Sequence, residues 1–113
     1  MSSEIGLPVY KSTYDLFTYS FELIRDIDKD YKYTVGEKLK NQILELMMNI
    51  YRANLGRKRK KRIKKAQENI QMVKILFKVL KDLNQISLKK FARVNKKIED
   101  VSKQITGWHN SLN

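Results

Sequence analysis

Apolar residues recur along most of the chain at intervals of three and four, the spacing that gathers them on one face of an α-helix. The pattern falls into four segments, and we expect helices at about residues 12–30, 35–54, 58–84 and 87–112. The last segment has the most regular pattern, with steps of 3, 4, 3, 4, 3 and 4 joining Phe91, Val94, Ile98, Val101, Ile105, Trp108 and Leu112. Such a stripe is typical of helices packed nearly antiparallel in a bundle.

Helix-end signals agree with these segments. Two hydroxyl residues are each followed three positions later by an acid, the form of a capping pair at a helix start: Ser12 with Asp15, and Thr34 with Glu37. Ser87 is a third candidate cap, for the last helix. Gly56 stands where a left-handed residue would end the second helix. The six tyrosines and Trp108 could stack on bases, but we expect Trp108, Tyr31, Tyr33 and Tyr51 to pack structurally.

The segments are joined by short connections of two to six residues, which force neighbouring helices to run antiparallel. We therefore predict an all-α fold, an antiparallel up-down-up-down four-helix bundle. Residues 1–9 contain Pro8 and are expected to form a flexible tail before a single domain at 10–113. The length of 113 residues suits one domain, and four glycines and one proline argue against a turn-rich β fold.

Positive charge is concentrated in the second half of the chain. Residues 1–54 carry seven Lys/Arg against eight Asp/Glu, whereas residues 55–113 carry seventeen against four. Eight of the nine positions from Arg57 to Lys65 are basic, with Ile63 the exception. Such asymmetry predicts an anionic partner, with nucleic acid first and an acidic membrane surface second.

The basic run could also be a solvated loop at a fraying helix end, or a localisation signal by composition alone. Two further groups favour a binding surface: Lys74, Lys78 and Lys81 share one helix face, and Lys89, Lys90 and Arg93 open the last helix. Cations on helices displace counterions from phosphates, and no base-reading motif is recognisable. The candidate nucleic-acid-binding residues are Arg57, Lys58, Arg59, Lys60, Lys61, Arg62, Lys64, Lys65, Lys74, Lys78, Lys81, Lys89, Lys90 and Arg93.

Residues for catalysis or metal binding are scarce. The chain has no cysteine and a single histidine, His109, so we expect no metal site, no cofactor and no catalytic set. The absence of cysteine suits a reducing cytoplasm. The first residues do not have the form of a signal peptide, and no apolar run reaches the roughly 20 residues of a membrane span.

One stretch imitates a calcium-binding loop. Its acids occupy the first, third, fifth and twelfth positions of an EF-hand pattern: Asp26, Asp28, Asp30 and Glu37. The sixth position needs glycine for a sharp turn and is Tyr31 here. A polar helix end, a turn and the Thr34–Glu37 cap explain the same residues more simply.

Residues 31–54 (YKYTVGEKLKNQILELMMNIYRAN), residues 73–91 (VKILFKVLKDLNQISLKKF) and Gly107–Trp108 resemble the accessory variability determinant (Avd) proteins of diversity-generating retroelements. The similarity covers about residues 10–112. These proteins belong to a wider set of bacterial four-helix bundles that includes proteins encoded in ribosomal-RNA intervening sequences. The latter usually carry a Pro-x-Asn-Ile-Ala-Glu-Gly type segment after the second helix, which this chain replaces with NIYRANLGRKRK.

The resemblance implies a barrel-like homopentamer that binds nucleic acid, as RNA or RNA/DNA hybrid, and the element's reverse transcriptase. Such a protein would support error-prone copying of a template RNA into a variable gene without being an enzyme. The family's basic residues spaced by four on the third helix fall on Lys74 and Lys78.

Three alternatives are open. The basic face could dock an acidic protein surface, or the chain could be a ribosomal-RNA-associated bundle without a reverse transcriptase partner. Peripheral membrane binding is the weakest of the three, because the apolar stripes are used inside the bundle and leave little to insert.

Overall fold

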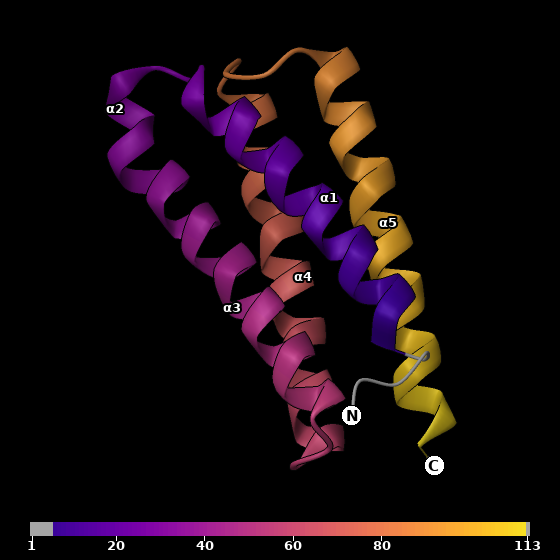
Figure 1. The fold of residues 1–113 in the computed structure, drawn as a ribbon. Coiled ribbons are helices and arrows are strands. Elements are labelled where there is room, and N and C mark those ends of the chain that lie inside the picture. The colour runs from indigo at the N-terminus through magenta and orange to yellow at the C-terminus, as the bar shows by residue number, and fades with distance from the viewer. Residues whose placement is uncertain (1–5, 113) are drawn as a thin grey trace.

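The computed structural model describes residues 6–112, and it is all-α over that range. Its elements are α1 (Gly6–Arg25), α2 (Lys29–Tyr31), the π-helical turn η1 (Lys32–Gly36), α3 (Glu37–Asn54), α4 (Arg59–Asp82) and α5 (Leu88–Ser111). Because α2, η1 and α3 follow one another without a break, the chain forms four long helices. Neighbouring helices run in opposite directions (Figure 1), so the predicted antiparallel four-helix bundle is confirmed.

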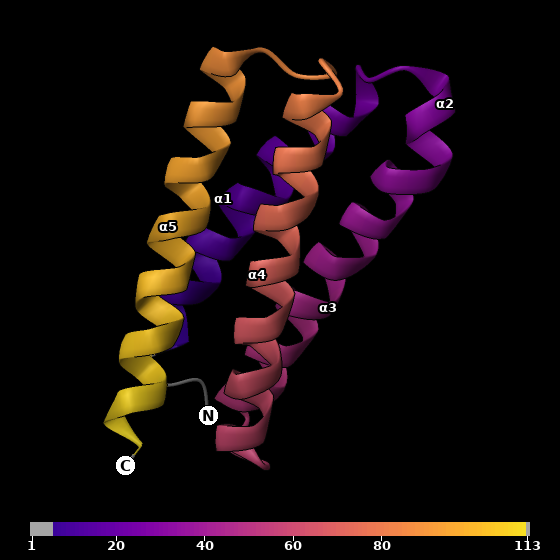
Figure 2. The ribbon, with the colours of Figure 1, turned by 180° about the vertical axis from the view of Figure 1, so that it is seen from behind.

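The four helices form a ring around one core. Helix α1 packs against α3 and α5, and α4 packs against the same two helices from the other side. The connection between α3 and α4 lies at the same end of the bundle as the end of α5, and the α4–α5 connection lies at the opposite end (Figures 1 and 2). Phe77 of α4 is fully buried, and Leu16, Leu46 and Ile98 bring the other three helices into the same core.

The first helix begins earlier than its pattern indicated. Helix α1 starts at Gly6, so residues 6–9 are helical rather than part of the expected tail, and residues 1–5 lie outside the described range. Pro8 is compatible with a first turn because its missing N–H needs no partner there. Val9 is buried, which anchors this turn to the core. Ser12 is therefore inside α1 rather than at its start, and its Oγ accepts a hydrogen bond of 2.7 Å from Gln104 Nε2.

The second helix also begins earlier, and the Thr34–Glu37 cap is absent from the structure. Thr34 Oγ1 instead donates to the carbonyl oxygens of Asp30 (3.2 Å) and Tyr31 (3.4 Å), as expected for a hydroxyl within a helix. The helical residues 29–36 also occupy the stretch that an EF-hand would need as a loop. Of the simpler interpretation, the turn is confirmed, because Asp26 and Asp28 lie between α1 and α2, whereas the cap is wrong.

Gly36 explains how η1 approaches α1. A Cβ atom placed on Gly36 would lie 3.2 Å from Ile24 Cγ2 and 3.3 Å from the Tyr31 carbonyl oxygen, closer than most side chains tolerate. The absent side chain therefore permits close contact between the two elements. The same end of the bundle is tied together by Asp28, whose backbone N–H donates to Gln85 Oε1 at 2.7 Å.

The predicted end of the first helix at about residue 30 is wrong, because α1 ends at Arg25 and Asp28 has an extended backbone. The helix-end signals at Gly56 and Ser87 are confirmed. Gly56 follows α3 with φ of 93°, the left-handed conformation that favours glycine. Helix α4 ends at Asp82 and is followed by Asn84, also left-handed, whose N–H donates to Lys81 O at 2.9 Å. Ser87 caps α5, because its Oγ accepts from the Lys90 N–H at 3.1 Å.

Candidate nucleic-acid interface

The basic run, defined as Arg57–Lys65, forms the connection between α3 and α4 and the first turns of α4. Gly56 and Lys58 both have positive φ, so the connection is a tight turn. Arg59 is half-buried and its Nε donates to Ala53 O at 2.9 Å, at the end of α3. The Ala53 carbonyl also accepts from the Gly56 N–H at 3.0 Å, so Arg59 adds a second donor at a helix C-terminus, where a cation is favoured by the helix dipole. This predicted site residue thus has a structural role at the turn.

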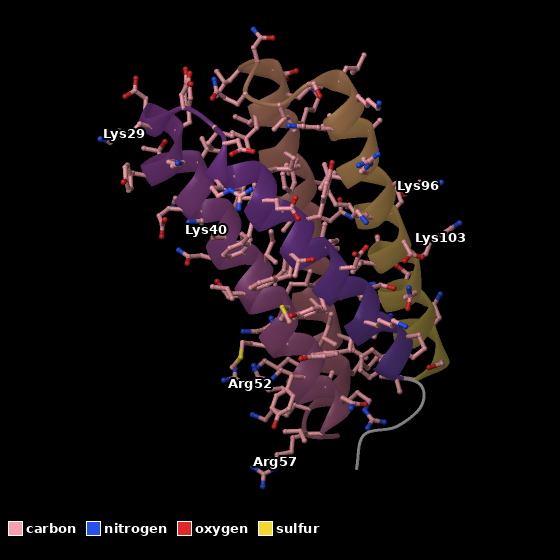
Figure 3. The ribbon with its side chains drawn as sticks, turned by 45° about the horizontal axis from the view of Figure 1, so that its top comes forward. Lys29, Lys40, Arg52, Arg57, Lys96 and Lys103 are labelled. Atoms are coloured by element: carbon pink, nitrogen blue, oxygen red, sulfur yellow. The ribbon has the colours of Figure 1, made fainter. Side chains whose placement is uncertain are left out.

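The remaining cations of the run face solvent. Lys58, Lys60, Lys61, Lys64 and Lys65 are all exposed, and Arg62 is half-buried. Within the described residues, the side chains of the run form no ion pair. Arg57 projects from this end of the bundle (Figure 3). Because positive charge at a helix N-terminus opposes the helix dipole, this segment would be stabilised by an anion.

A second group of cations lies toward the other end of the bundle. Between Lys65 and Lys74, α4 carries no basic residue, and at 1.5 Å rise per residue this leaves a gap of roughly 13 Å. Beyond it come Lys74 and Lys78, and then, across the α4–α5 connection, exposed Lys89, Lys90 and Arg93. The predicted binding surface is therefore divided into two clusters of cations, toward opposite ends of the α4–α5 pair.

The second cluster differs from the first because its α4 members have acidic partners. We call Lys74, Lys78 and Lys81 the paired lysines. Lys74 Nζ lies 3.2 Å from Glu99 Oε2 of α5. Lys78 Nζ lies 2.9 Å from Asp82 Oδ2, and Lys81 Nζ lies 3.5 Å from Asp82 Oδ1.

Asp82 therefore pairs with two lysines, one at each of its carboxylate oxygens. The hydrogen bond from Lys78 is the largest influence on this carboxyl, and with the charges of Lys78 and Lys81 it holds the pKa of Asp82 below its usual value, against partial desolvation. Lys81 is further held by Phe91, with Nζ 5.1 Å from the ring centroid.

Other cations of α5 point away from the bundle or toward α1. Lys96 and Lys103 project outward from α5 (Figure 3). Lys97 turns toward α1, where its Nζ lies 2.6 Å from Asp15 Oδ2 and 5.3 Å from the centroid of the Tyr19 ring.

Apart from Leu88 at the start of α5, the exposed large apolar side chains of the described residues lie on other elements. One group lies on α1 and α3 and the α3 C-cap: Tyr10, Tyr14, Leu44, Met48, Tyr51 and Leu55. Between these helices Lys40 lies over the Phe21 ring at 5.6 Å, and Phe21 stacks on Phe17 with centroids 4.4 Å apart. A second group lies on η1, α4 and the α4 C-cap: Tyr33, Met72, Ile75 and Leu83.

Two tyrosines depart from the packing expected of them. Trp108 is 5% exposed and belongs to the core, as predicted, and Tyr31 packs against the core while half-buried. Tyr33 is 69% exposed and Tyr51 54%, so both rings are available on the surface. For Tyr51 the helical spacing could not decide this, because the residue directly follows the buried Ile50.

Two kinds of site find no support in the part of the chain that the structure describes. No group of three or more His, Cys, Asp or Glu side chains is arranged to hold a metal ion among residues 6–112. Over the same range, every helix is too short or too polar to cross a lipid bilayer.

Comparison with known protein families decides the relationship. A family described as bAvd-like matches residues 8–112, nearly the whole chain. The chain belongs to the bAvd-like family. The match confirms the resemblance found in the sequence, and the four-helix bundle is the fold that it implied. No curated protein sequence matches this bAvd-like chain closely enough to count as a relative.

The acidic residues Glu99 and Asp82 are the part of the site that the sequence did not indicate. The Lys78–Asp82 pair has i,i+4 spacing within one helix and could have been found from the sequence. The Lys74–Glu99 pair joins two helices of this bAvd-like bundle, so finding it requires the register between α4 and α5.

Proposed function

We propose that this bAvd-like protein is a non-enzymatic, nucleic-acid-binding accessory subunit that works with a retroelement reverse transcriptase. The observation that carries the proposal is the exposed basic run, whose side chains have no ion pair within the described residues. A phosphate backbone supplies the anions that such a surface lacks, and its binding releases condensed counterions. Family membership supports the assignment of the polymerase as partner.

The proposed role in copying is to hold the template. Backbone contacts position a nucleic acid without reading its sequence, which suits a protein that must retain a template while it is copied with errors. The polymerase would supply all of the chemistry. We propose RNA or RNA/DNA hybrid as the ligand on the strength of the resemblance.

We further propose that the protein assembles as a ring, a homopentamer by its resemblance to the Avd proteins. A ring requires a heterologous contact between two different patches of the same chain. The apolar group on α1 and α3 and the apolar group on η1 and α4 are two such patches. Burying them would leave the outer face of α5 and its cations in solvent.

Binding of the purified protein to RNA, measured by fluorescence anisotropy from low to high salt, tests the proposed function. The affinity is expected to fall steeply as salt rises, because cation–phosphate contacts dominate. A charge-matched polyanion without bases should compete, since the contacts are to phosphate. Weak, salt-independent binding would overturn the proposal.

A second candidate is an interaction scaffold whose basic face docks an acidic protein. The exposed tyrosines and aliphatic side chains favour a protein partner for some part of the surface. Co-purification of the reverse transcriptase before and after nuclease treatment separates the candidates. A partner that stays bound only while nucleic acid is present supports the proposed function, and the scaffold predicts retention in both cases.

A further inference from the structure

The two cation clusters differ in whether carboxylates lie beside them. Around the basic run, the described side chains place no carboxylate within ion-pair distance of a cation. Around the paired lysines, Glu99 and Asp82 occupy all three ammonium groups at 2.9 to 3.5 Å. A nucleic acid that binds at this second cluster must therefore compete with carboxylates for the lysines.

We infer that Glu99 and Asp82 are resident anions that set the affinity of the α4–α5 face for phosphodiester backbones. Phosphate oxygens replace the carboxylates as acceptors for Lys74 and Lys78. The freed Glu99 turns to solvent, whereas Asp82 stays beside Lys81. The two acids are thereby affinity-determining residues although they never contact the ligand. This inference rests on the proposed function.

The geometry makes the exchange possible. The side chains of Lys74 and Glu99 are each about half exposed, at 47% and 53%, so the pair can open without unpacking the core. Lys78 is more exposed still, at 65%. Exposed pairs of this kind contribute little to folding, because water solvates both partners well once they separate.

Lys81 completes the arrangement as an anchor. It is the least exposed of the paired lysines at 31%, and its Nζ lies over the Phe91 ring as well as beside Asp82 Oδ1. When phosphate draws Lys78 away, Lys81 still neutralises Asp82. The lowered pKa of Asp82 means that this competitor is ionised at every physiological pH.

If these acids compete with phosphate for the lysines, removing one acid should tighten RNA binding. Glu99→Gln frees Lys74 and removes a negative charge that would lie beside the bound phosphate. We expect roughly two- to five-fold tighter RNA binding at low salt, the range that corresponds to loss of one exposed ion pair. Asp82→Asn should act similarly through Lys78, and the double variant should exceed either.

Glu68→Gln is the matched control. Glu68 is exposed on α4 and has no ion pair within the described residues, so its neutralisation changes the net charge by the same amount without freeing a lysine. Its effect on affinity is expected to stay well below that of Glu99→Gln. Circular dichroism of all variants verifies that the bundle is intact.

A double-mutant cycle distinguishes competition from general charge. Lys74→Gln should weaken binding more in the Glu99→Gln background than in the wild-type protein, because there the lysine contacts phosphate without first losing its pairing with Glu99. Equal losses in both backgrounds would show that Glu99 does not compete for Lys74.

The outcomes separate this inference from the function on which it rests. If the wild-type protein fails to bind RNA, both the proposed function and the resident-anion inference are overturned. If it binds with the expected salt dependence but Glu99→Gln and Asp82→Asn bind no better than Glu68→Gln, the proposed function stands and the resident-anion inference is overturned.

Discussion

Asn49 of α3 donates from its Nδ2 to Asn69 Oδ1 of α4 at 2.8 Å, in a bundle core that is otherwise almost wholly apolar. Asn69 Nδ2 in turn donates to Gln42 Oε1 at 3.0 Å. The two asparagines are only 6% and 7% exposed, so their amide groups depend on each other rather than on water. This polar chain favours one register of α3 against α4, the pair whose connection carries the basic run.

Asn69→Ala should destabilise the bundle more than its lost volume suggests. The substitution leaves Asn49 and Gln42 without their partner in a poorly solvated place, at a cost of about 1–3 kcal/mol. Urea unfolding followed by circular dichroism measures the change. Asn41→Ala, on the exposed face of α3, is the control and should change stability by less than about 0.5 kcal/mol.

The same substitution of Gly by Ala should act in opposite directions at two positions. At Gly56, φ of 93° is strained for any residue with a Cβ, so Gly56→Ala should cost about 1 kcal/mol. At Gly107 in α5, a Cβ would meet no described atom within 4 Å, and Gly107→Ala should stabilise by about 0.5–1 kcal/mol. Thermal unfolding reports both. A destabilised Gly107→Ala would place α5 in contact with something beyond this chain.

The pairing of Asp82 predicts a specific titration. Its lowered pKa means that the folded protein favours the ionised carboxylate, so this stabilisation is present above the unfolded pKa and is lost as the pH falls through the folded one. Lys78→Gln removes the largest cause, and the pKa of Asp82 should then rise toward its ordinary value. Carboxyl-detected NMR titration measures it. Lys60→Gln, at the far end of α4, should leave the pKa of Asp82 unchanged. If the pKa of Asp82 were also unchanged in Lys78→Gln, the pairing would be contradicted.

Much of the fold could be predicted because buried positions repeat at helical intervals. The stripe from Val94 to Trp108 is buried at each of its predicted core positions. Helix starts were harder to predict, since a hydroxyl followed by an acid resembles a cap wherever it occurs. Ser12 and Thr34 both have that form, yet tertiary packing continues the helices past them.

The candidate site was predictable in composition but not in its electrostatics. The exposed run at Arg57–Lys65 follows from its charge density alone. The role of Arg59 at the end of α3 depends on a turn with two left-handed residues, which the basic pattern does not reveal. The contact between Lys74 and Glu99 joins residues 25 positions apart, so its prediction requires the helix register.

The central claim is that the basic run binds phosphate, and the salt dependence of RNA affinity tests it most directly. The measurement compares the wild-type protein with a triple variant of the run, Lys60→Gln, Lys61→Gln and Lys64→Gln. Its control removes the same charge elsewhere, through Lys29→Gln, Lys32→Gln and Lys38→Gln on α2, η1 and α3.

Each phosphate contact contributes about 0.7 to 0.9 to the slope of log affinity against log salt. The run variant should therefore lose about 2 to 3 from the magnitude of that slope, while the control keeps the wild-type slope. Equal slopes for the run variant and the wild-type protein would contradict the account.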